Sequence, residues 1–279
     1  MGGAAARGEP RSFVTAPTNA ELLDVAREAA TVAGALLLER FATGATGEVW
    51  TKSSPTDPAS EADTASEAAI RKVLGERRPD DAVVGEEGAD VEGRSGLRWV
   101  VDPLDGTVNY LYGLPAWTVT LACQDGAGET RAGVVYDPGR GELFAATADG
   151  PWTRNGGELS PRPRATELSQ ALVGTGFGYA VERRAREGEI AARVLSVARD
   201  LRRIGSAALD LAWTACGRLD AFYERGLHPW DAAAGMLICA RAGLEVRALT
   251  AAEGLPAGVL VAPAAIADEL ETVVRPSGR

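Results

Sequence analysis

At 279 residues, the chain is long enough for one large domain or two. Apolar residues make up 46% and charged residues 24%, which is typical of a soluble globular protein, and a net charge of −10 without a basic run argues against a nucleic-acid partner. The sequence contains neither an apolar signal-peptide core at its start nor a stretch long enough to span a membrane, so a cytoplasmic protein without a membrane partner is expected.

The first half of the chain predicts helices followed by antiparallel strands. Residues 1–17 are rich in Gly, Ala, Pro and Arg without periodicity and predict a disordered lead. Apolar residues then recur three and four positions apart over residues 18–41 and 59–77, which predicts two helices. Strands are predicted at 81–85, 99–101, 117–122, 133–137, 142–146 and 150–152. Residues 18–157 are therefore predicted to form an N-terminal α+β subdomain, which also contains the candidate metal site around residues 102–107.

In the second half, strands and helices alternate after a polar connection at 158–169. Strands are predicted at 171–175, 201–204, 220–223 and 258–262, and helices at 181–200, 207–216, 232–242 and from residue 263 onward. The segment 224–229 is predicted to be a loop. Alternation of this kind indicates α/β layers, so residues 158–279 are predicted to form a C-terminal α/β subdomain, and the whole chain an α+β protein.

The stretch 99–117 holds the strongest candidate site. An apolar run, typical of a buried strand, leads into the hexapeptide DPLDGT at 102–107. Its two carboxylates and the intervening carbonyl of Leu104 offer three hard oxygens in one stiff turn, which suits Mg²⁺. Gly106 lets the backbone approach a ligand, and Thr107 supplies a hydroxyl and an N–H group where a phosphate could bind. An ordinary Asp-Pro turn explains the hexapeptide equally well.

Further acidic residues occupy positions typical of ligand sites, although each has a simpler interpretation. Asp63 lies in the first turn of a predicted helix, where a carboxylate also favours the helix dipole. Glu86 and Glu87 follow a predicted strand, where they could be part of a solvated loop. Asp231 opens a helix after the loop that holds the only histidine, His228, for which a structural role is expected.

These carboxylates have no matching basic partners in the sequence, which suggests bound cations. The three cysteines, Cys123, Cys216 and Cys239, are far apart and are expected to be buried free thiols. Without a Cys/His cluster, zinc is disfavoured. Carboxylates and carbonyl oxygens beside a Gly-Thr phosphate cradle instead point to Mg²⁺-assisted phosphoryl chemistry.

Several motifs in order make the chain resemble the inositol monophosphatase family of Mg²⁺-dependent, lithium-sensitive sugar phosphatases. The motifs span about residues 20–245 and are KSSPTD at 52–57, GEEG at 85–88, DPLDGTVNYLYGLP at 102–115, GSAALDL at 205–211 and HPWDAAAG at 228–235. The resemblance implies a layered αβαβα fold and a homodimer. It also implies a phosphomonoesterase that uses two or three Mg²⁺ ions and metal-activated water on inositol monophosphate or a similar small polyol phosphate.

The resemblance also implies a role for each matching residue. The ligands of a first metal would be Glu86, Asp102 and the Leu104 carbonyl, and those of a second would be Asp102, Asp105 and Asp231, with a third, looser ion near Glu86. Thr107, with Asp63 behind it, would orient and deprotonate the attacking water, which makes Asp63, Glu86 and Thr107 the implied catalytic residues. The implied substrate contacts are Gly106, Thr107, Ser206, Ala207, Glu224 and Asp231. Lys52 lies where the family has a flexible loop that closes over the metals.

Some features depart from the family, and several functions stay open. The helix after Asp231 ends in Gly243-Leu244 rather than Gly-Gly, and the segment 245–256 looks shortened, which concerns the substrate rim. Glu224 suits a polyol hydroxyl or the ammonium of an amino alcohol, so histidinol phosphate is an alternative substrate. Adenosine 3′,5′-bisphosphate and fructose 1,6-bisphosphate are further ones. A non-catalytic scaffold on the same fold is the alternative outside enzymes.

Overall fold

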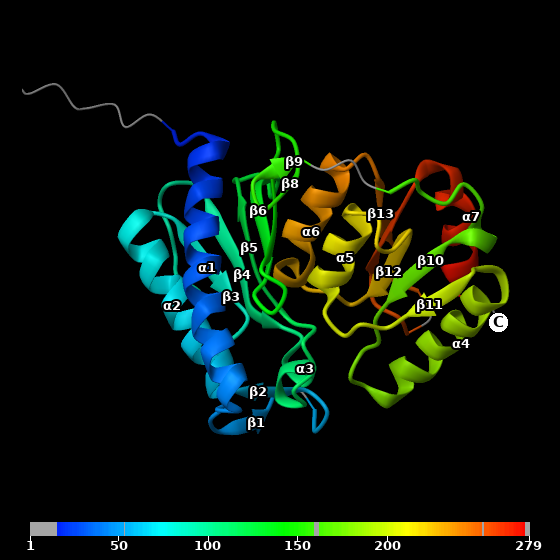
Figure 1. Ribbon diagram of the computed structural model, residues 1–279, viewed down its shortest axis with the longest axis horizontal. Coiled ribbons are helices and arrows are strands. Elements are labelled where there is room, and N and C mark those ends of the chain that lie inside the picture. Colours follow the sequence, from blue (N-terminus) through cyan, green and yellow to red (C-terminus); the bar gives the residue numbers. More distant parts are fainter. Residues whose placement is uncertain (1–15, 53, 159–161, 253, 277–279) are drawn as a thin grey trace, which may run out of the picture.

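The computed structural model of the chain describes residues 16–52, 54–158, 162–252 and 254–276. Five layers of secondary structure alternate in the order αβαβα (Figure 1). Helices α1 (Asn19–Thr43) and α2 (Glu61–Arg77) cover one face of a seven-stranded sheet. Helices α5 (Ala207–Ala215) and α6 (Pro229–Arg241) lie between this sheet and a five-stranded sheet. The layers confirm the predicted fold class.

The outer helices of the first layer begin and end where their capping residues predict. Thr18 caps α1 through a reciprocal pair of hydrogen bonds with Glu21, and Gly44 ends it with a φ of 67°. Between α1 and α2 the chain forms an unpredicted hairpin of β1 (Val49–Thr51) and β2 (Pro58–Ser60). The disordered lead expected over residues 1–17 lies, apart from residues 16 and 17, outside the described residues.

The first sheet is antiparallel except for the parallel pair β3–β4. Its strands, in spatial order, are β3 (Ala82–Gly85), β4 (Arg98–Asp105), β5 (Thr118–Gln124), β6 (Thr130–Asp137), β7 (Glu142–Thr147), β8 (Thr153–Arg154) and β9 (Gly157–Glu158). The strand predicted at 150–152 is wrong. The chain pairs instead around Asn155 and Gly156, whose φ angles of 51° and 76° form the tight turn that an Asn-Gly pair favours.

The second sheet mixes parallel and antiparallel pairs. Its strands, in spatial order, are β11 (Asp200–Arg202), β10 (Leu172–Thr175), β12 (Ala221–Arg225), β14 (Gly258–Ala262) and β13 (Glu245–Leu249). Its outer face is covered by α4 (Val181–Val197) and α7 (Ala264–Val274), and a short 3₁₀ turn, η1 (Leu168–Gln170), precedes β10. The division into subdomains at residues 157 and 158 stays a proposal.

Two predictions for the second half of the chain are corrected. Glu224, predicted to open a loop, lies within β12 and pairs with Val259 of β14. In the segment 245–256, for which no strand was predicted, Glu245–Leu249 form the edge strand β13. The helix predicted to reach residue 200 ends at Val197, because the chain turns there to enter β11.

The middle helices pack closely against both sheets because their contact faces carry small residues. Ala208, Ala212, Ala233 and Ala234 are buried in one apolar cluster with residues of both sheets. A Cβ atom built at Gly133 of β6 would lie 2.9 Å from the Cα of Ala234, so only glycine permits this approach. None of the described helices is long and apolar enough to cross a membrane.

Candidate active site

A bulge at the end of β4 presents the carboxylates of the central motif. Asp102 pairs with Thr120 of β5 and Asp105 with Thr118, so Pro103 and Leu104 face a single residue of the neighbouring strand. Proline has no N–H group to donate to the sheet, which favours a bulge at this position. The Leu104 N–H donates to Asp102 Oδ1 at 3.0 Å and thereby fixes the carboxylate in the turn.

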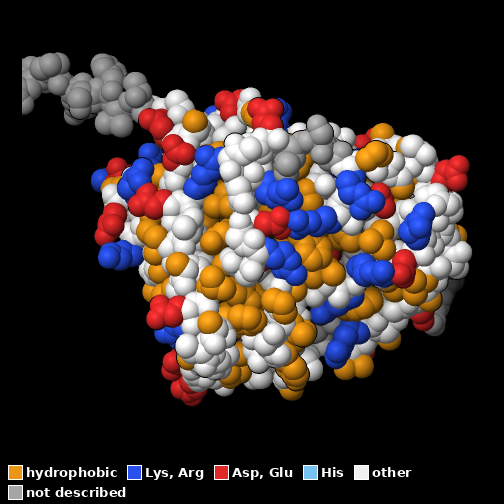
Figure 2. Space-filling model, in the orientation of Figure 1, with side chains coloured by type: hydrophobic (Ala, Val, Ile, Leu, Met, Phe, Trp, Pro, Cys, Tyr) orange, Lys and Arg blue, Asp and Glu red, His pale blue; other side chains and the backbone are white. Residues whose placement is uncertain are grey.

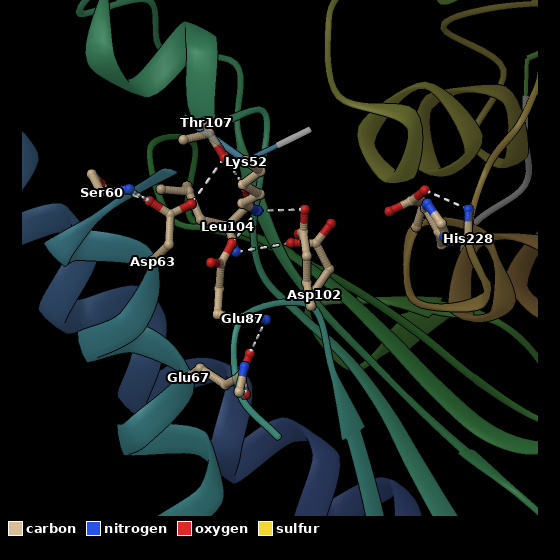
Figure 3. Close-up of polar contacts among 12 residues, drawn as sticks. Lys52, Ser60, Asp63, Glu67, Glu87, Asp102, Leu104, Thr107 and His228 are labelled. Carbon is tan, nitrogen blue, oxygen red and sulfur yellow. Dashed lines mark hydrogen bonds and ion pairs between the residues drawn. The ribbon is translucent and has the colours of Figure 1, made fainter. Parts of the chain in front are cut away.

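The short helix α3 (Thr107–Leu111) begins directly after this bulge and positions the Thr107 hydroxyl. Thr107 Oγ1 lies 2.9 Å from Asp63 Oδ1 and 3.1 Å from the Leu104 carbonyl oxygen (Figure 3). The other oxygen of Asp63 accepts the N–H and the hydroxyl of Ser60, at 2.8 and 2.6 Å. Asp63 therefore both caps α2 and contacts Thr107. This geometry is compatible with a structural role at the start of the helix and with the catalytic role that the resemblance implies.

Glu86 lies beside a lysine that the sequence did not pair with it. Lys52 Nζ is 2.7 Å from Glu86 Oε1 and also contacts Glu87 (Figure 3). The expectation that the acidic cluster has no basic partner is thus wrong for Glu86. Glu67 of α2 fixes the turn, since its carboxylate accepts the N–H groups of Glu87 and Gly88 at 2.8 and 2.9 Å. Glu67 was missed, although it lies one helical turn after Asp63.

The second half of the chain contributes the remaining acidic residues. Asp231 lies in the first turn of α6, where its Oδ2 accepts a hydrogen bond from the backbone N–H of His228 at 2.7 Å. The His228 ring stacks on Trp230, with centroids 4.7 Å apart. The carboxylate of Glu224 lies against Gly176, where an added Cβ atom would meet it at 2.1 Å, so a larger residue at 176 would displace this carboxylate.

Asp105 links the two halves of the molecule. Its Oδ2 accepts the Ser206 hydroxyl and the Ala208 N–H, both at 2.7 Å, at the start of α5. Ser206 in turn caps this helix through the N–H of Leu209. The end of β4 and the start of α5 are therefore held together by one carboxylate across about a hundred residues of sequence.

These side chains surround one cavity of about 350 Å³ between the two sheets. Of the eleven residues predicted for the site, ten line it, and Asp63 lies behind Thr107. The ten are Glu86, Asp102, Leu104, Asp105, Gly106, Thr107, Ser206, Ala207, Glu224 and Asp231. The cavity is also lined by Tyr179, Arg183 and Arg203, which no motif indicated.

The acidic residues raise one another's pKa values. Burial raises the pKa of Asp102 well above its usual value, and the charges of Glu86, Asp105 and Asp231 raise it further. Burial, with the charge of Asp105, raises the pKa of Asp231 and of Glu224 to about 8 each. For Asp105 burial raises the pKa to about 6, against the hydrogen bonds from Ser206 and Ala208. The buried cluster is therefore short of positive charge.

The donor set fits a hard divalent cation in its chemistry. It consists of carboxylates and a backbone carbonyl, with no thiolate in the cavity lining. Within the described part of the chain, however, no group of three or more Asp, Glu, Cys or His side chains is arranged so that it could hold an ion without moving. Lys52 contacts Glu86, and one oxygen of Asp105 faces Ser206 and Ala208, so these side chains would have to turn toward an ion.

Comparisons with known proteins agree with this geometry. A sequence model of the inositol monophosphatase family matches residues 18–275. The chain is 48% identical over 234 residues to the inositol-1-monophosphatase SuhB of Mycobacterium tuberculosis, covering 80% of each chain. It is 38% identical over 224 residues to the Nus factor SuhB of Escherichia coli, covering 80% of this chain and 83% of the relative.

A solved structure is similar over almost the whole fold. The extragenic suppressor protein suhB of Bartonella henselae superposes with a TM-score of 0.84 at 31% identity. The similarity covers 91% of this chain and 98% of the other.

Proposed function

The chain belongs to the inositol monophosphatase family, and we propose that it is a Mg²⁺-dependent phosphomonoesterase that hydrolyses inositol monophosphate or a similar small polyol phosphate. Family membership supports a phosphatase in general terms. The observation that carries the specific proposal is the convergence of Glu86, Asp102, Asp105 and Asp231 on one cavity beside the Thr107–Asp63 pair.

Two metal positions follow from the acidic cluster. Glu86, Asp102 and the Leu104 carbonyl would hold one ion, and Asp102, Asp105 and Asp231 a second, with room for a third near Glu86. Bound Mg²⁺ would neutralise the phosphate and acidify a water molecule. Lys52 would have to release Glu86 first, so this lysine and the first ion compete for the same carboxylate.

Thr107 would accept the proton of the attacking water while its own hydroxyl proton passes to the Asp63 carboxylate, which is therefore the final proton acceptor. Its hydroxyl donates to Asp63 Oδ1, which leaves a lone pair on Oγ1 free to accept a hydrogen bond from water. Asp63 is held on its other oxygen by Ser60 and so keeps Thr107 in one orientation. The phosphate oxygens would accept the backbone N–H groups of Gly106 and Thr107.

The polyol end of the substrate would lie against the second half of the chain. Ser206, Ala207, Glu224 and Asp231 line that side of the cavity. With a pKa of about 8 in the absence of metal, Glu224 retains a proton at neutral pH and can donate to a hydroxyl as well as accept from one. Once it has lost this proton, the same residue would pair with an ammonium, which keeps histidinol phosphate as the second substrate to test.

A panel of phosphate esters tests the proposal. Phosphate release from inositol 1-phosphate, histidinol phosphate, adenosine 3′,5′-bisphosphate and fructose 1,6-bisphosphate would be measured with Mg²⁺, with EDTA and with added Li⁺. We expect release that requires Mg²⁺, is inhibited by Li⁺ and is fastest for inositol 1-phosphate. Equal release with EDTA would contradict the metal assignment, and a different fastest ester would correct the substrate.

A non-catalytic function is the second candidate, because the relative from Escherichia coli carries the name Nus factor SuhB. Folded protein that binds Mg²⁺ but releases no phosphate from any of the four esters would favour it. The complete set of carboxylates favours the enzyme, since buried like charges destabilise a fold that has no cation to hold. The homodimer stays a prediction, which sedimentation equilibrium would check.

A further inference from the structure

A second cavity, of about 360 Å³, lies at the C-terminal end of α5 and shares no lining residue with the first. Four arginines line it, together with Gln170 and Asp220. They are Arg162, Arg164, Arg199 and Arg218. Figure 2 shows several basic side chains over the region between α5 and β10. Such a concentration of positive charge needs explanation in a chain with a net charge of −10.

Three of these arginines lack an acidic partner among the described residues. Arg164 donates to the carbonyl oxygens of Thr214 and Ala215, at 2.8 Å each, and Arg199 donates to the carbonyl of Gln170 at 2.9 Å. Arg162 is exposed at the rim. Arg218 is the one arginine of the four that forms an ion pair within the described part of the chain, with Glu142. Burial lowers the pKa of Arg164, and nearby Asp220 does not offset that effect.

Asp220 is occupied by the backbone rather than by the arginines. Its two carboxylate oxygens accept the N–H groups of Ala165 and Leu172, at 3.1 and 2.8 Å. These bonds fix the start of β10 against the connection that precedes it. Because three arginines without an ion pair among the described residues line the cavity together with one aspartate, it keeps an excess of positive charge.

A purely structural role explains only part of the cluster. Arg164 satisfies the last carbonyl groups of α5, a favourable place for a cation at a helix C-terminus. That role requires one arginine. This capping role does not explain Arg162, which among the described residues contacts no carbonyl at the end of α5. It also does not explain why Arg162, Arg164 and Arg199 line the same cavity.

We propose that this cavity binds a small polyphosphate anion, through Arg162, Arg164 and Arg199. Three guanidinium charges without an acidic partner among the described residues suit a ligand with several negative charges. In Arg164 and Arg199, two nitrogens of each guanidinium group already donate to protein oxygens, of Thr214 and Ala215 and of Gln170, so a phosphate would be bound by their remaining N–H groups and by Arg162. Among the described residues, no aromatic side chain lines the cavity, so they offer no platform on which a nucleobase could stack. The phosphate chain alone would be recognised, whether it belongs to inorganic polyphosphate or to a nucleotide.

The site would act at the far end of a helix that contacts the first cavity. The start of α5 holds Asp105 through Ser206 and Ala208, and its end is held by Arg164. A ligand that moves Arg164 would therefore be placed to affect the same helix. Binding itself is the testable claim, and it holds or fails independently of the phosphatase proposal.

Isothermal titration calorimetry of the full-length protein tests it, in EDTA so that metal-dependent binding in the first cavity is removed. The ligands are inorganic tripolyphosphate, ATP and sulfate. We expect tripolyphosphate and ATP to bind with similar affinity at low salt, and sulfate to bind at least tenfold more weakly. A clear preference for ATP would contradict recognition of the phosphate chain alone.

Two variants locate the binding. Arg162→Ala and Arg199→Gln should each weaken tripolyphosphate binding about tenfold, since each removes a charged donor. The matched control is Arg184→Ala, which removes an exposed arginine of α4 that does not line this cavity. Unchanged affinity in both cavity variants, an equal loss in the control, or no binding to the wild-type protein would overturn the proposal. Circular dichroism confirms that each variant is folded.

Discussion

At the scale of single residues, Asp102 is the most buried of the four proposed metal-binding carboxylates and lies close to the other three. Its side chain is 2% exposed, and three other carboxylates raise its pKa. Under the proposed function it is a ligand of both ions, so its replacement should lower phosphatase activity more than the replacement of any other residue of the site. In the absence of metal, the same charge is expected to destabilise the fold.

Asp102→Asn should therefore separate activity from stability. We expect Mg²⁺-dependent phosphate release to fall by about a thousandfold or more. The free energy of unfolding in EDTA should stay equal or rise by about 1 kcal/mol, because a buried like charge is removed. Phosphate assays and urea unfolding measure the two effects. Asp90→Asn, at an exposed loop residue, is the control, and wild-type activity in Asp102→Asn would refute the metal assignment.

Thr107→Val tests the proposed path of the proton. Valine keeps the shape of threonine but lacks the hydroxyl that contacts Asp63 and Leu104. We expect kcat to fall about a hundredfold with little change in KM, as for loss of a proton acceptor. The buried Asp63 oxygen would also lose a donor, at a cost of about 1–3 kcal/mol in stability. Steady-state kinetics with an unchanged kcat would exclude Thr107 from the reaction.

At the scale of elements, the turn from β4 into α3 depends on a backbone that only glycine tolerates. Gly106 has a φ of 99°, and a Cβ atom there would lie 2.9 Å from the Ala116 carbonyl oxygen. The Thr107 hydroxyl and the Asp105 carboxylate stand on either side of it. Strain at this residue should therefore disturb both neighbours.

Gly106→Ala should lower the free energy of unfolding by about 2–4 kcal/mol and reduce phosphate release. Gly113→Ala provides a matched control, since Gly113 also has a positive φ, of 72°, but has no atom within 4 Å of the added Cβ. It should cost only about 1–2 kcal/mol. Chemical denaturation of both variants measures the difference, and equal losses would show that the contact with Ala116 contributes nothing.

At the scale of the whole molecule, the acidic cavity between the sheets should make the metal-free protein sensitive to pH. Carboxylates titrate near 4 in the unfolded chain, whereas the folded values are about 6 for Asp105 and about 8 for Asp231 and Glu224. Between these values the folded state binds more protons than the unfolded state. The contribution of the cluster to stability therefore falls as the pH rises from about 4 to about 8.

Urea unfolding in EDTA at pH 5, 6.5 and 8 measures this effect. We expect the free energy of unfolding to decline more steeply with pH in the wild type than in Asp231→Asn, which lacks one of the titrating groups. Saturating Mg²⁺ should flatten the wild-type profile, because the cation stabilises the ionised carboxylates. Parallel pH profiles for wild type and variant would show that Asp231 keeps an ordinary pKa in the fold.

Local patterns in the sequence were enough to predict most helices and strands and the chemical type of the site. Helical spacing predicted α1 and α2, start and stop residues predicted α5 and α6, and the DPLDGT motif predicted the oxygen-rich turn. The edge strand β13 was not predicted, because its alternating charged and apolar residues become a strand only through pairing with β14. The hairpin of β1 and β2 was missed for the same reason, since each strand has only three residues.

The sequence by itself determined the fold class, the main helices and the residues that converge on the first cavity. The fold class and the helices depend on hydrogen bonds and apolar contacts that repeat every two to four residues, so they leave a local pattern. The full set of residues at the first cavity was implied instead by motifs that resemble those of the family. Only the tertiary structure decided that Lys52 contacts Glu86, that Asp105 is held by Ser206, that Glu224 lies in a strand and that three arginines surround a second cavity. Each of these depends on residues far apart along the chain, whose contact is set by how the layers pack.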